Sequence, residues 1–295
     1  MGHDHHEGQR VSRRTVFAGI SSIGLGSLLA ACTGSDGSGT TQPVTTSTGA
    51  TVTPQATTTA DLSDLFDGAN TCTLTATTTQ GPYYFDADKI RSDIREDRQG
   101  TRLRVALMVQ DSEACKPLSN AVVEIWHCDA NGLYSGAESL STGGSSGGSS
   151  GGGAPPAGGG PGSGGSSGGG TSGGGAQDLT PTDDQRYLRG AQVTSSDGIV
   201  EFTTIWPGWY RGRTVHIHVM VHVSNQRVLT SQLMFDENLN SKVLATAPYN
   251  TRSGRDTLNS NDSIFNDSML MKTTAETGGY LGVHVLSVDS DRDGA

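Results

Sequence analysis

The segment Tyr210–His218 holds the residues best suited to metal chemistry. It reads Tyr-Arg-Gly-Arg-Thr-Val-His-Ile-His, so His216 and His218 stand two positions apart, after a tyrosine and Arg213. Successive side chains of a strand point to opposite faces, and residues two apart share a face. The opposite face of this predicted strand is entirely apolar: Val215, Ile217, Val219, Val221 and Val223. We therefore expect both imidazoles on one face, where they can bind one metal ion.

Two further segments each place a tyrosine just beyond a predicted strand. Tyr134 follows the apolar run 122–127 and the turn dipeptide Asn131-Gly132, and Tyr210 follows the run 202–206 and a Pro-Gly pair. A phenolate is a hard oxygen donor with a high pKa, so a strongly charged Lewis acid is needed to keep it deprotonated. Iron(III) fits this need better than zinc or copper(I). Because Fe³⁺, two tyrosinates and one hydroxide sum to zero charge, such a site can be buried.

Other interpretations of these residues stay open at this point. The His-Ile-His triplet alone can be a chance pair on a half-exposed strand, and a single tyrosine is usually a packed ring with a bonded hydroxyl. A zinc or copper hydrolase could use the histidines, but it leaves both tyrosines without a role. A non-catalytic extracellular module that binds aromatic ligands or polymers is the main alternative function, because a fold does not fix function.

In their order and spacing, several motifs closely resemble the intradiol ring-cleavage dioxygenases, the non-haem iron(III) family of the catechol and protocatechuate dioxygenases, and in particular exported members. The matching segments cover most of residues 72–265: Thr79–Tyr84, Arg91–Asp97, Trp126–Ser135, Pro207–Tyr210, Arg213–His218 and Thr230–Gln232. The resemblance implies one non-haem Fe(III) per chain. The ligands that it implies are Tyr134, Tyr210, His216 and His218.

The resemblance also implies an activity and roles for nearby residues. Arg213 matches the family's active-site arginine, Gln232 matches a glutamine beside the iron ligands, and Tyr210 matches the ligand that the substrate displaces. The implied reaction cleaves a catechol-type diol with O2 between its two hydroxylated carbons, giving a cis,cis-muconate-type product. Two departures leave the identity of the diol open: a short spacing from Tyr210 to His216, and a glycine-rich insert between the two tyrosines.

The folded part of the chain reads as short strands separated by turns. We expect strands at 103–109, 121–127, 198–204, 213–223, 228–235 and 282–288, and little helix. This pattern predicts an all-β fold, a single β-sandwich domain of the intradiol dioxygenase type, over residues 63–295. Residues 143–175 are almost entirely Gly and Ser, and we expect them to form a disordered loop insertion within that domain.

The first residues predict export. Ser12–Phe17 resembles a twin-arginine (Tat) motif, and Leu29-Ala-Ala-Cys32 resembles a bacterial lipobox. We expect a signal peptide at 1–31, lipid attachment at Cys32, and a disordered tether at 32–62 that is rich in Thr, Ser and Gly. Simple secretory cleavage is the alternative. The expected location is the outer face of the cell membrane, with the lipid as the sole membrane contact, or the secreted fraction.

The charge and the remaining cysteines fit this picture. A net charge of −10 argues against nucleic acid as a partner. The partners that the family resemblance implies are an aromatic diol and O2. Of Cys72, Cys115 and Cys128, we expect the first two to pair, because they lie in loop-like sequence whereas Cys128 adjoins an apolar run. The sequence leaves the oligomeric state open.

Overall fold

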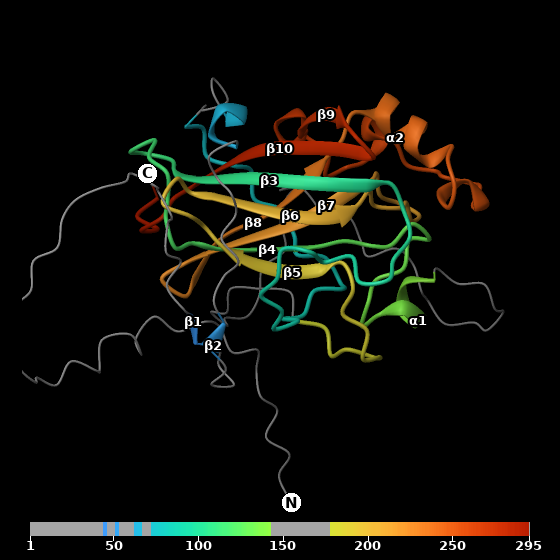
Figure 1. Ribbon diagram of the computed structural model, residues 1–295, viewed down its shortest axis with the longest axis horizontal. Helices are drawn as coiled ribbons and strands as arrows, with labels where there is room; N and C mark the ends of the chain where they lie inside the picture. Colours follow the sequence, from blue (N-terminus) through green and yellow to red (C-terminus); the bar gives the residue numbers. More distant parts are fainter. Residues whose placement is uncertain (1–43, 46–50, 53–61, 67–71, 143–177, 295) are drawn as a thin grey trace, which may run out of the picture.

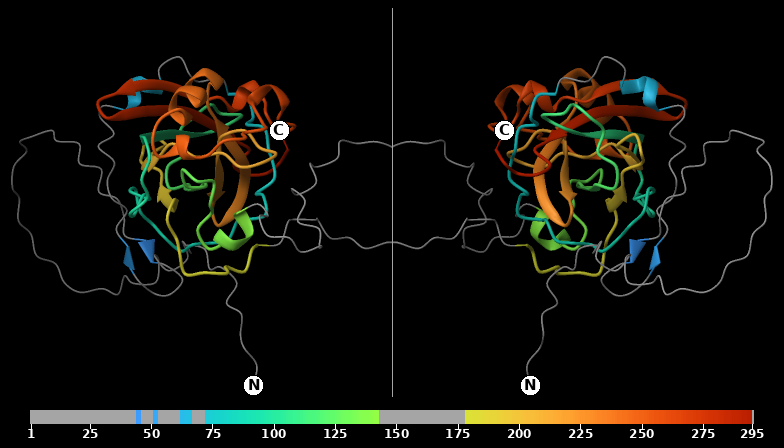
Figure 2. Two further views of the ribbon diagram at one scale, coloured as in Figure 1. Left: turned by 90° about the vertical axis from the view of Figure 1, so that its right-hand side faces the viewer. Right: turned by 90° about the vertical axis from the view of Figure 1, so that its left-hand side faces the viewer.

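Two four-stranded β-sheets form the body of the protein (Figures 1 and 2). The computed structural model describes residues 44–45, 51–52, 62–66, 72–142 and 178–294. Helical segments are few and short, and the core lies between the inner faces of the sheets. The all-β sandwich expected from the sequence is confirmed.

The first sheet has the strand order β6-β3-β10-β9. β3 runs antiparallel to β6 and parallel to β10, so the first and last long strands of the chain lie side by side (Figure 1). β9 closes the other edge, antiparallel to β10. The strands of this sheet are β3 (Arg102–Asp111), β6 (Ile199–Ile205), β9 (Lys272–Glu276) and β10 (Gly279–Val288).

The second sheet carries the two histidines and has the order β5-β4-β7-β8, with every neighbouring pair antiparallel. Its register places His218 opposite Trp126 on one side and Gln232 on the other. Residues opposite each other in a ladder point to the same face, so these side chains share the outer face of the sheet. The strands are β4 (Val122–Trp126), β5 (Arg189–Val193), β7 (His216–Val223) and β8 (Gln226–Met234).

Strand β7 is buried on both faces. Its apolar side chains enter the core between the sheets, together with residues of β3 and β6 such as Leu107 and Phe202. Its other face lies beneath an extended segment at 76–84, which is fastened to β8 by hydrogen bonds from Thr78 N to Thr230 O and from Ser231 Oγ to Ala76 O. The histidines therefore lie in a second buried layer outside the sandwich core.

The short helices lie at the margins of the sheets. α2 lies at one end of the sandwich, and the Asp236 side chain caps it by accepting from the Asn238 and Leu239 N–H groups (Figure 1). None of the described helices has the length and apolar character needed to cross a membrane. The helices are η3 (Ser63–Phe66), α1 (Glu138–Ser141), α2 (Glu237–Leu244), η4 (Tyr249–Thr251), η5 (Asn259–Asn261) and η6 (Asp267–Met269).

The sequence analysis missed β5, β9 and α2, whose residues lack a clear apolar period. β5 reads Arg-Gly-Ala-Gln-Val, and β9 reads Lys-Thr-Thr-Ala-Glu at a sheet edge where few of its side chains are buried. α2 buries Asn240 and Val243 alone. The expected strand 213–223 begins instead at His216, because Arg213 lies in a tight turn bridged to Tyr210. β5 forms by pairing with the distant β4, whereas β9 pairs with the neighbouring β10 across a tight turn.

Several sequence predictions concern residues outside the described part. These are the signal peptide 1–31, Cys32, most of the tether 32–62, and the insert 143–175. Within 32–62 the structure describes a pairing of β1 (Val44–Thr45) with β2 (Thr51–Val52), and also Leu62. Leu62 and Phe66 are buried against Ala106, Ile199, Leu281 and Val283 of the first sheet.

One disulfide joins Cys72 to Cys115, whose Cα atoms are 5.3 Å apart, and Cys128 is free and buried. The bridge joins Cys72, which precedes the segment 76–84 that covers β7, to Cys115 in the loop that follows β3. It is the pairing that the sequence analysis favours. Because 43 positions separate the two cysteines, the bridge closes a long loop and restricts the unfolded chain.

Removing this disulfide should destabilise the fold without touching the histidine layer. We expect the double variant Cys72→Ser/Cys115→Ser to lose about 4 kcal/mol of unfolding free energy, the chain-entropy value for a loop of this size. Urea unfolding under oxidising conditions measures it. Wild type under reducing conditions should match the variant, and the variant should not respond to reductant. An unchanged urea midpoint would show that the bridge adds no stability.

Candidate metal centre

Four side chains from separate parts of the chain converge on the outer face of the second sheet. The Nε2 atoms of His216 and His218 lie 3.1 Å apart, and the Tyr210 hydroxyl lies 3.1 Å from His216 Nε2. The Tyr134 ring centroid is 5.7 Å from that of Tyr210 and 6.3 Å from that of His218. The structure thus brings together all four ligands that the sequence resemblance implied.

The two tyrosines are positioned by turns that pack backbone against backbone. Asp129 accepts hydrogen bonds from the N–H groups of Asn131 and Leu133, which fixes the turn before Tyr134. Gly208 N donates to Asp129 O, and a Cβ on Gly208 would lie 2.4 Å from that oxygen. Only glycine allows this approach. The strand-end turns therefore hold the segments of Tyr134 and Tyr210 against each other.

The tautomer of His216 is fixed by the backbone. Its Nδ1 lies 2.7 Å from the carbonyl oxygen of Thr214, which can only accept, so the proton of the neutral ring is on Nδ1. The lone pair of Nε2 then points toward Tyr210 and His218. Burial, followed by the charge of Arg213, lowers the pKa of His216 to about 3. The imidazole is thus a neutral donor at physiological pH, as metal binding requires.

Stacking orients the ring of His218, whose Nε2 also contacts Nε2 of His216. Its ring lies parallel to that of Trp126 at an interplanar angle of 3° and a centroid distance of 4.9 Å. A Cβ on Gly81 would lie 3.1 Å from His218 Cε1, and the positive φ of Gly81 (+72°) also favours glycine there. Burial holds the pKa of His218 well below its usual range. The His218 ring is therefore also neutral, and its Nε2 faces that of His216.

Among the described residues, the Tyr134 hydroxyl lacks the hydrogen-bond partner that a buried phenol usually has, although the residue is only 1% exposed. Burial raises the pKa of both Tyr134 and Tyr210, so in the protein alone both are neutral. A buried polar group without a partner costs roughly 1–3 kcal/mol. A cation between the rings would give both oxygens a partner and reverse the effect of burial on their ionisation.

These donors fit a single iron(III) ion. Two nitrogens at about 2.1 Å from one ion, at right angles, would lie about 3 Å apart, which agrees with the 3.1 Å between the two Nε2 atoms. Two neutral imidazoles and two phenolic oxygens form a mixed, mainly hard donor set. Half of the donors are tyrosines, which sets this cluster apart from sites built of His, Cys, Asp and Glu alone.

Comparison with known proteins supports the same assignment. No protein-family model and no curated protein matches the chain. An intradiol ring-cleavage dioxygenase from Tetranychus urticae is 30% identical, with 74% of this chain and 96% of that chain covered and a TM-score of 0.60. The present chain belongs to the intradiol ring-cleavage dioxygenase family. It is therefore an oxygenase, as the sequence motifs implied.

Other solved structures are similar to this dioxygenase. A second dioxygenase crystal structure is 30% identical, with coverage of 74% and 96% and a TM-score of 0.59. The dioxygenase domain of a carbohydrate-binding protein fusion from Streptomyces sp. SirexAA-E is 24% identical, with coverage of 74% and 99% and a TM-score of 0.48.

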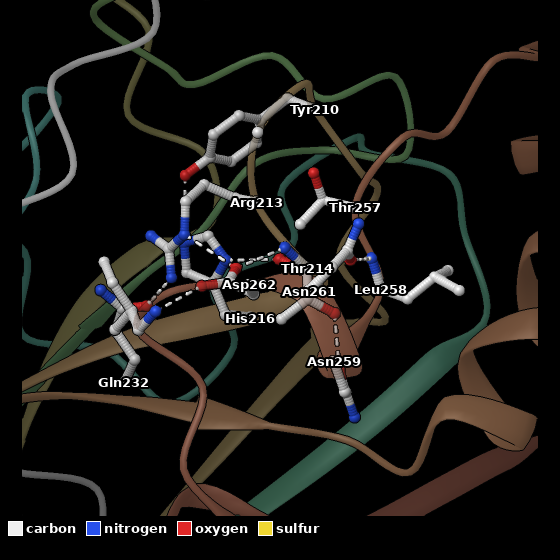
Figure 3. Close-up of polar contacts among 12 residues, drawn as sticks. Tyr210, Arg213, Thr214, His216, Gln232, Thr257, Leu258, Asn259, Asn261 and Asp262 are labelled. Carbon is white, nitrogen blue, oxygen red and sulfur yellow. Dashed lines mark hydrogen bonds and ion pairs between the residues drawn. The ribbon is translucent and has the colours of Figure 1, made fainter.

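The dioxygenase holds Arg213 between two partners beside the donor cluster (Figure 3). Its Nη2 donates to Gln232 Oε1, and its Nε donates to Asp262 Oδ2 at 2.9 Å. Gln232 is held in turn by a hydrogen bond from its Nε2 to Thr79 O at 3.5 Å. Both residues named by the resemblance, Arg213 and Gln232, therefore lie next to the proposed ligands and contact each other.

Asp262 is a site residue that the sequence analysis did not find. The same oxygen that accepts from Arg213 also accepts from Thr214 N at 2.7 Å, and Thr214 carries the carbonyl that orients His216. The Asp262 side chain is fully buried, whereas Arg213 is 15% exposed. Asp262 stands alone in a polar loop, so no local signal marks it. Its role appears only when the loop folds back onto the start of β7.

A network from α2 holds the Asp262 loop in place. Asn259 accepts from the Thr214 hydroxyl at 2.6 Å (Figure 3) and donates through Nδ2 to Phe235 O. Its backbone N–H donates to Glu237, which pairs with Arg255 at 2.6 Å. This network fastens the loop to the start of β7 and the end of β8. It thereby fixes the positions of Arg213 and His216 relative to each other.

The remaining candidates have structural roles. His127 contacts Thr204 Oγ1 through Nε2 at 2.7 Å and Cys128 O through Nδ1 at 2.8 Å, so neither nitrogen is available to a metal. His222 lies further along the outer face, opposite Val122, in a recess with Glu124. Neither histidine belongs to the donor cluster.

The Arg213–Asp262 ion pair predicts a pH-dependent contribution to stability. Burial alone would raise the pKa of Asp262, but Arg213 and the backbone donors hold it below its usual 3.8. A lowered carboxylate pKa adds stability at higher pH, and that stability is lost as the pH falls through the folded-state pKa. We expect Asp262→Asn to lose roughly 3 kcal/mol at pH 7. This gap should close below about pH 4, as measured by urea unfolding across pH.

A matched variant tests whether burial is the cause. Asp256 is 41% exposed and lies 3.7 Å from Arg211, so Asp256→Asn should change stability by less than about 1 kcal/mol. If Asp262→Asn were no more destabilising than Asp256→Asn at pH 7, the ion pair would not stabilise the site.

Proposed function

We propose that this dioxygenase uses iron(III) to cleave a catechol-type diol with O2 between the two hydroxylated carbons, giving a cis,cis-muconate-type product. The observation that carries the proposal is the convergence of two imidazole Nε2 atoms and the Tyr210 hydroxyl, at separations of 3.1 Å, beside the unpartnered hydroxyl of Tyr134. The other site residues support it through charge and position.

The four proposed ligands would hold one iron(III) per chain as a neutral unit. Two phenolates and one hydroxide balance the charge of Fe³⁺, and both imidazoles are neutral because burial lowers their pKa. A neutral unit avoids the large cost of burying net charge. When bound, the ion supplies Lewis acidity that withdraws electron density from a chelated diol. Every residue needed for this lies in the described part of the chain.

The two tyrosines differ in exposure, and this difference supports separate roles. Tyr134 is buried among Tyr83, Trp126 and Met220, whereas Tyr210 is only partly buried at the edge of this cluster. Tyr210 can therefore move away from the ligand position with less disruption of packing. We assign it as the displaced ligand, whose phenolate oxygen accepts a proton from the incoming diol. Tyr134 keeps its place and fixes the orientation of the site.

Arg213 is placed to stabilise negative charge on the ring. Its guanidinium is always cationic, and two of its nitrogens are held by Asp262 and Gln232. Because these contacts fix the cation before the substrate arrives, little reorganisation is needed as charge develops. Gln232 is assigned the role of orienting Arg213, since its oxygen accepts from Arg213 Nη2.

Oxygen uptake by the iron-loaded enzyme tests this function. We expect one O2 consumed per diol and a muconate-type absorbance with at least one member of a panel of catechol, hydroxyquinol, chlorinated catechols and lignin-derived acids. Arg213→Ala should keep iron and lower kcat roughly 10²–10³-fold, because a preorganised charge is removed. Arg211→Ala is the control, since Arg211 is 74% exposed and should leave turnover unchanged. No uptake with any diol would refute the proposed reaction.

We also propose that the enzyme is exported through the twin-arginine route and held at the outer face of the membrane by a lipid on Cys32. The motif at Ser12–Phe17 and the lipobox-like Leu29–Cys32 support this, and so does the Cys72–Cys115 disulfide, which is typical of an oxidising compartment. This route carries folded proteins, and it therefore suits one whose metal ligands lie so far apart in the chain.

Cys32→Ser should move the enzyme from the membrane pellet to the soluble fraction, since the lipid would lose its attachment atom. Fractionation followed by immunoblotting measures the distribution. Cys128→Ser is the matched control, because Cys128 is free and buried, and this variant should stay in the pellet. Retention of Cys32→Ser in the pellet would rule out the lipid anchor.

A further inference from the structure

Arg189 is a buried arginine that the proposed reaction does not use. It begins β5, pairs with Trp126 across the ladder, and is 1% exposed. Among the described residues, no carboxylate forms an ion pair with it. A buried guanidinium without a carboxylate is costly to desolvate, and burial lowers its pKa to about 10. Such a residue needs another reason to be placed there.

Its hydrogen bonds connect the loop that carries Tyr134 with the segment 76–84 that covers the site. Nε donates to Ser135 Oγ at 3.0 Å, and Nη2 donates to Ser135 O at 2.9 Å and to Tyr83 O at 2.7 Å. Ser135 follows the proposed ligand Tyr134 directly, and Tyr83 belongs to the segment that covers the site. One guanidinium therefore links the ligand loop to the covering segment.

The neighbouring contacts make this link rigid. The Tyr83 and Tyr134 rings pack at 4.8 Å, so fixing the backbone of one restrains the ring of the other. Ser135 Oγ donates to Tyr187 O at 2.7 Å, and the Arg189 guanidinium lies 4.1 Å from the centroid of the Phe85 ring. Neither Arg189 nor Ser135 can move without disturbing these contacts.

One nitrogen of Arg189 has no partner. Nη1 is buried and makes no hydrogen bond within the described residues, and the same is true of the Tyr134 hydroxyl. A negative charge on Tyr134 would raise the pKa of Arg189, as would one on Glu124. A phenolate at Tyr134 would therefore offset part of the unpaired positive charge in this layer.

We propose that Arg189 is a positioning residue that fixes Tyr134 as the inner oxygen ligand and provides a fixed positive charge near it. This inference rests on the proposed iron(III) site. It differs from a purely structural role, because it predicts effects on the bound metal as well as on folding. Partners beyond the direct ligands typically alter metal affinity by about 10–100-fold when they are changed.

The test compares variants of the full iron-loaded enzyme. Arg189→Met removes the charge and the hydrogen bonds, while Arg189→Lys keeps the charge but loses the two-nitrogen contact with Ser135. The readouts are the tyrosinate-to-iron(III) visible band, iron retention against a chelator, and urea unfolding without metal. We expect Arg189→Met to shift the band and to weaken iron retention about 10–100-fold, with a smaller effect for Arg189→Lys.

Arg186→Met is the matched control. Arg186 lies 4.8 Å from the same Phe85 ring, but its side chain donates only to the backbone of its own loop, at Asp183 and Gln185. This variant should leave the band and iron retention unchanged. Equal effects of the Arg186 and Arg189 variants would overturn the inference, because loss of the cation over Phe85 would then explain both.

The outcomes separate this inference from the proposed function. If wild type shows the visible band and Arg189→Met keeps both band and iron affinity while unfolding more easily, Arg189 is structural only and the function stands. If wild type binds no iron(III), both proposals fail. Should Arg189→Met not fold, Arg189→Lys decides: a shifted band supports the inference, and a wild-type band with unchanged iron retention refutes it.

Discussion

The site depends on one constraint: metal-type donors are buried where the protein alone does not satisfy them. The Tyr134 hydroxyl has no hydrogen-bond partner among the described residues. Such a group costs roughly 1–3 kcal/mol of stability, which the packing of the core must offset. The apolar core between the sheets, which is separate from the histidine layer, supplies stability that offsets this cost. A bound cation would give the Tyr134 oxygen a partner, and this gain would contribute to the free energy of metal binding.

The donors are held mainly by backbone contacts. Thr214 O selects the tautomer of His216, the Asp129 turn places Tyr134, and Gly208 lets the two tyrosine segments touch. Backbone groups belong to sheets and turns, so they shift less than long side chains. His216 and His218, at the start of β7, are therefore held as firmly as the sheet itself. A preorganised metal site requires such rigid support.

Two arginines flank the donors in different ways. Arg213 is paired with Asp262, so its charge is balanced and its side chain is held in place. Arg189 lies behind Tyr134 and has only neutral acceptors, so its charge stays available to an anion nearby. Together, Arg213 and Arg189 make the electrostatic potential around the donors more positive, which favours phenolates and an anionic diol.

The sequence by itself determined the sandwich class, the shared face of His216 and His218, and the two strand-end tyrosines. These follow from alternation and from turn dipeptides, which act over a few residues. Motif resemblance added Arg213 and Gln232, because their spacing from the ligands is short. The sequence did not reveal β5, β9, Asp262 or Arg189. Only the tertiary structure placed β5, Asp262 and Arg189, because their partners are 48 or more positions away and no local period records such contacts. β9 pairs with the neighbouring β10 across a tight turn, but its polar sequence hides the strand.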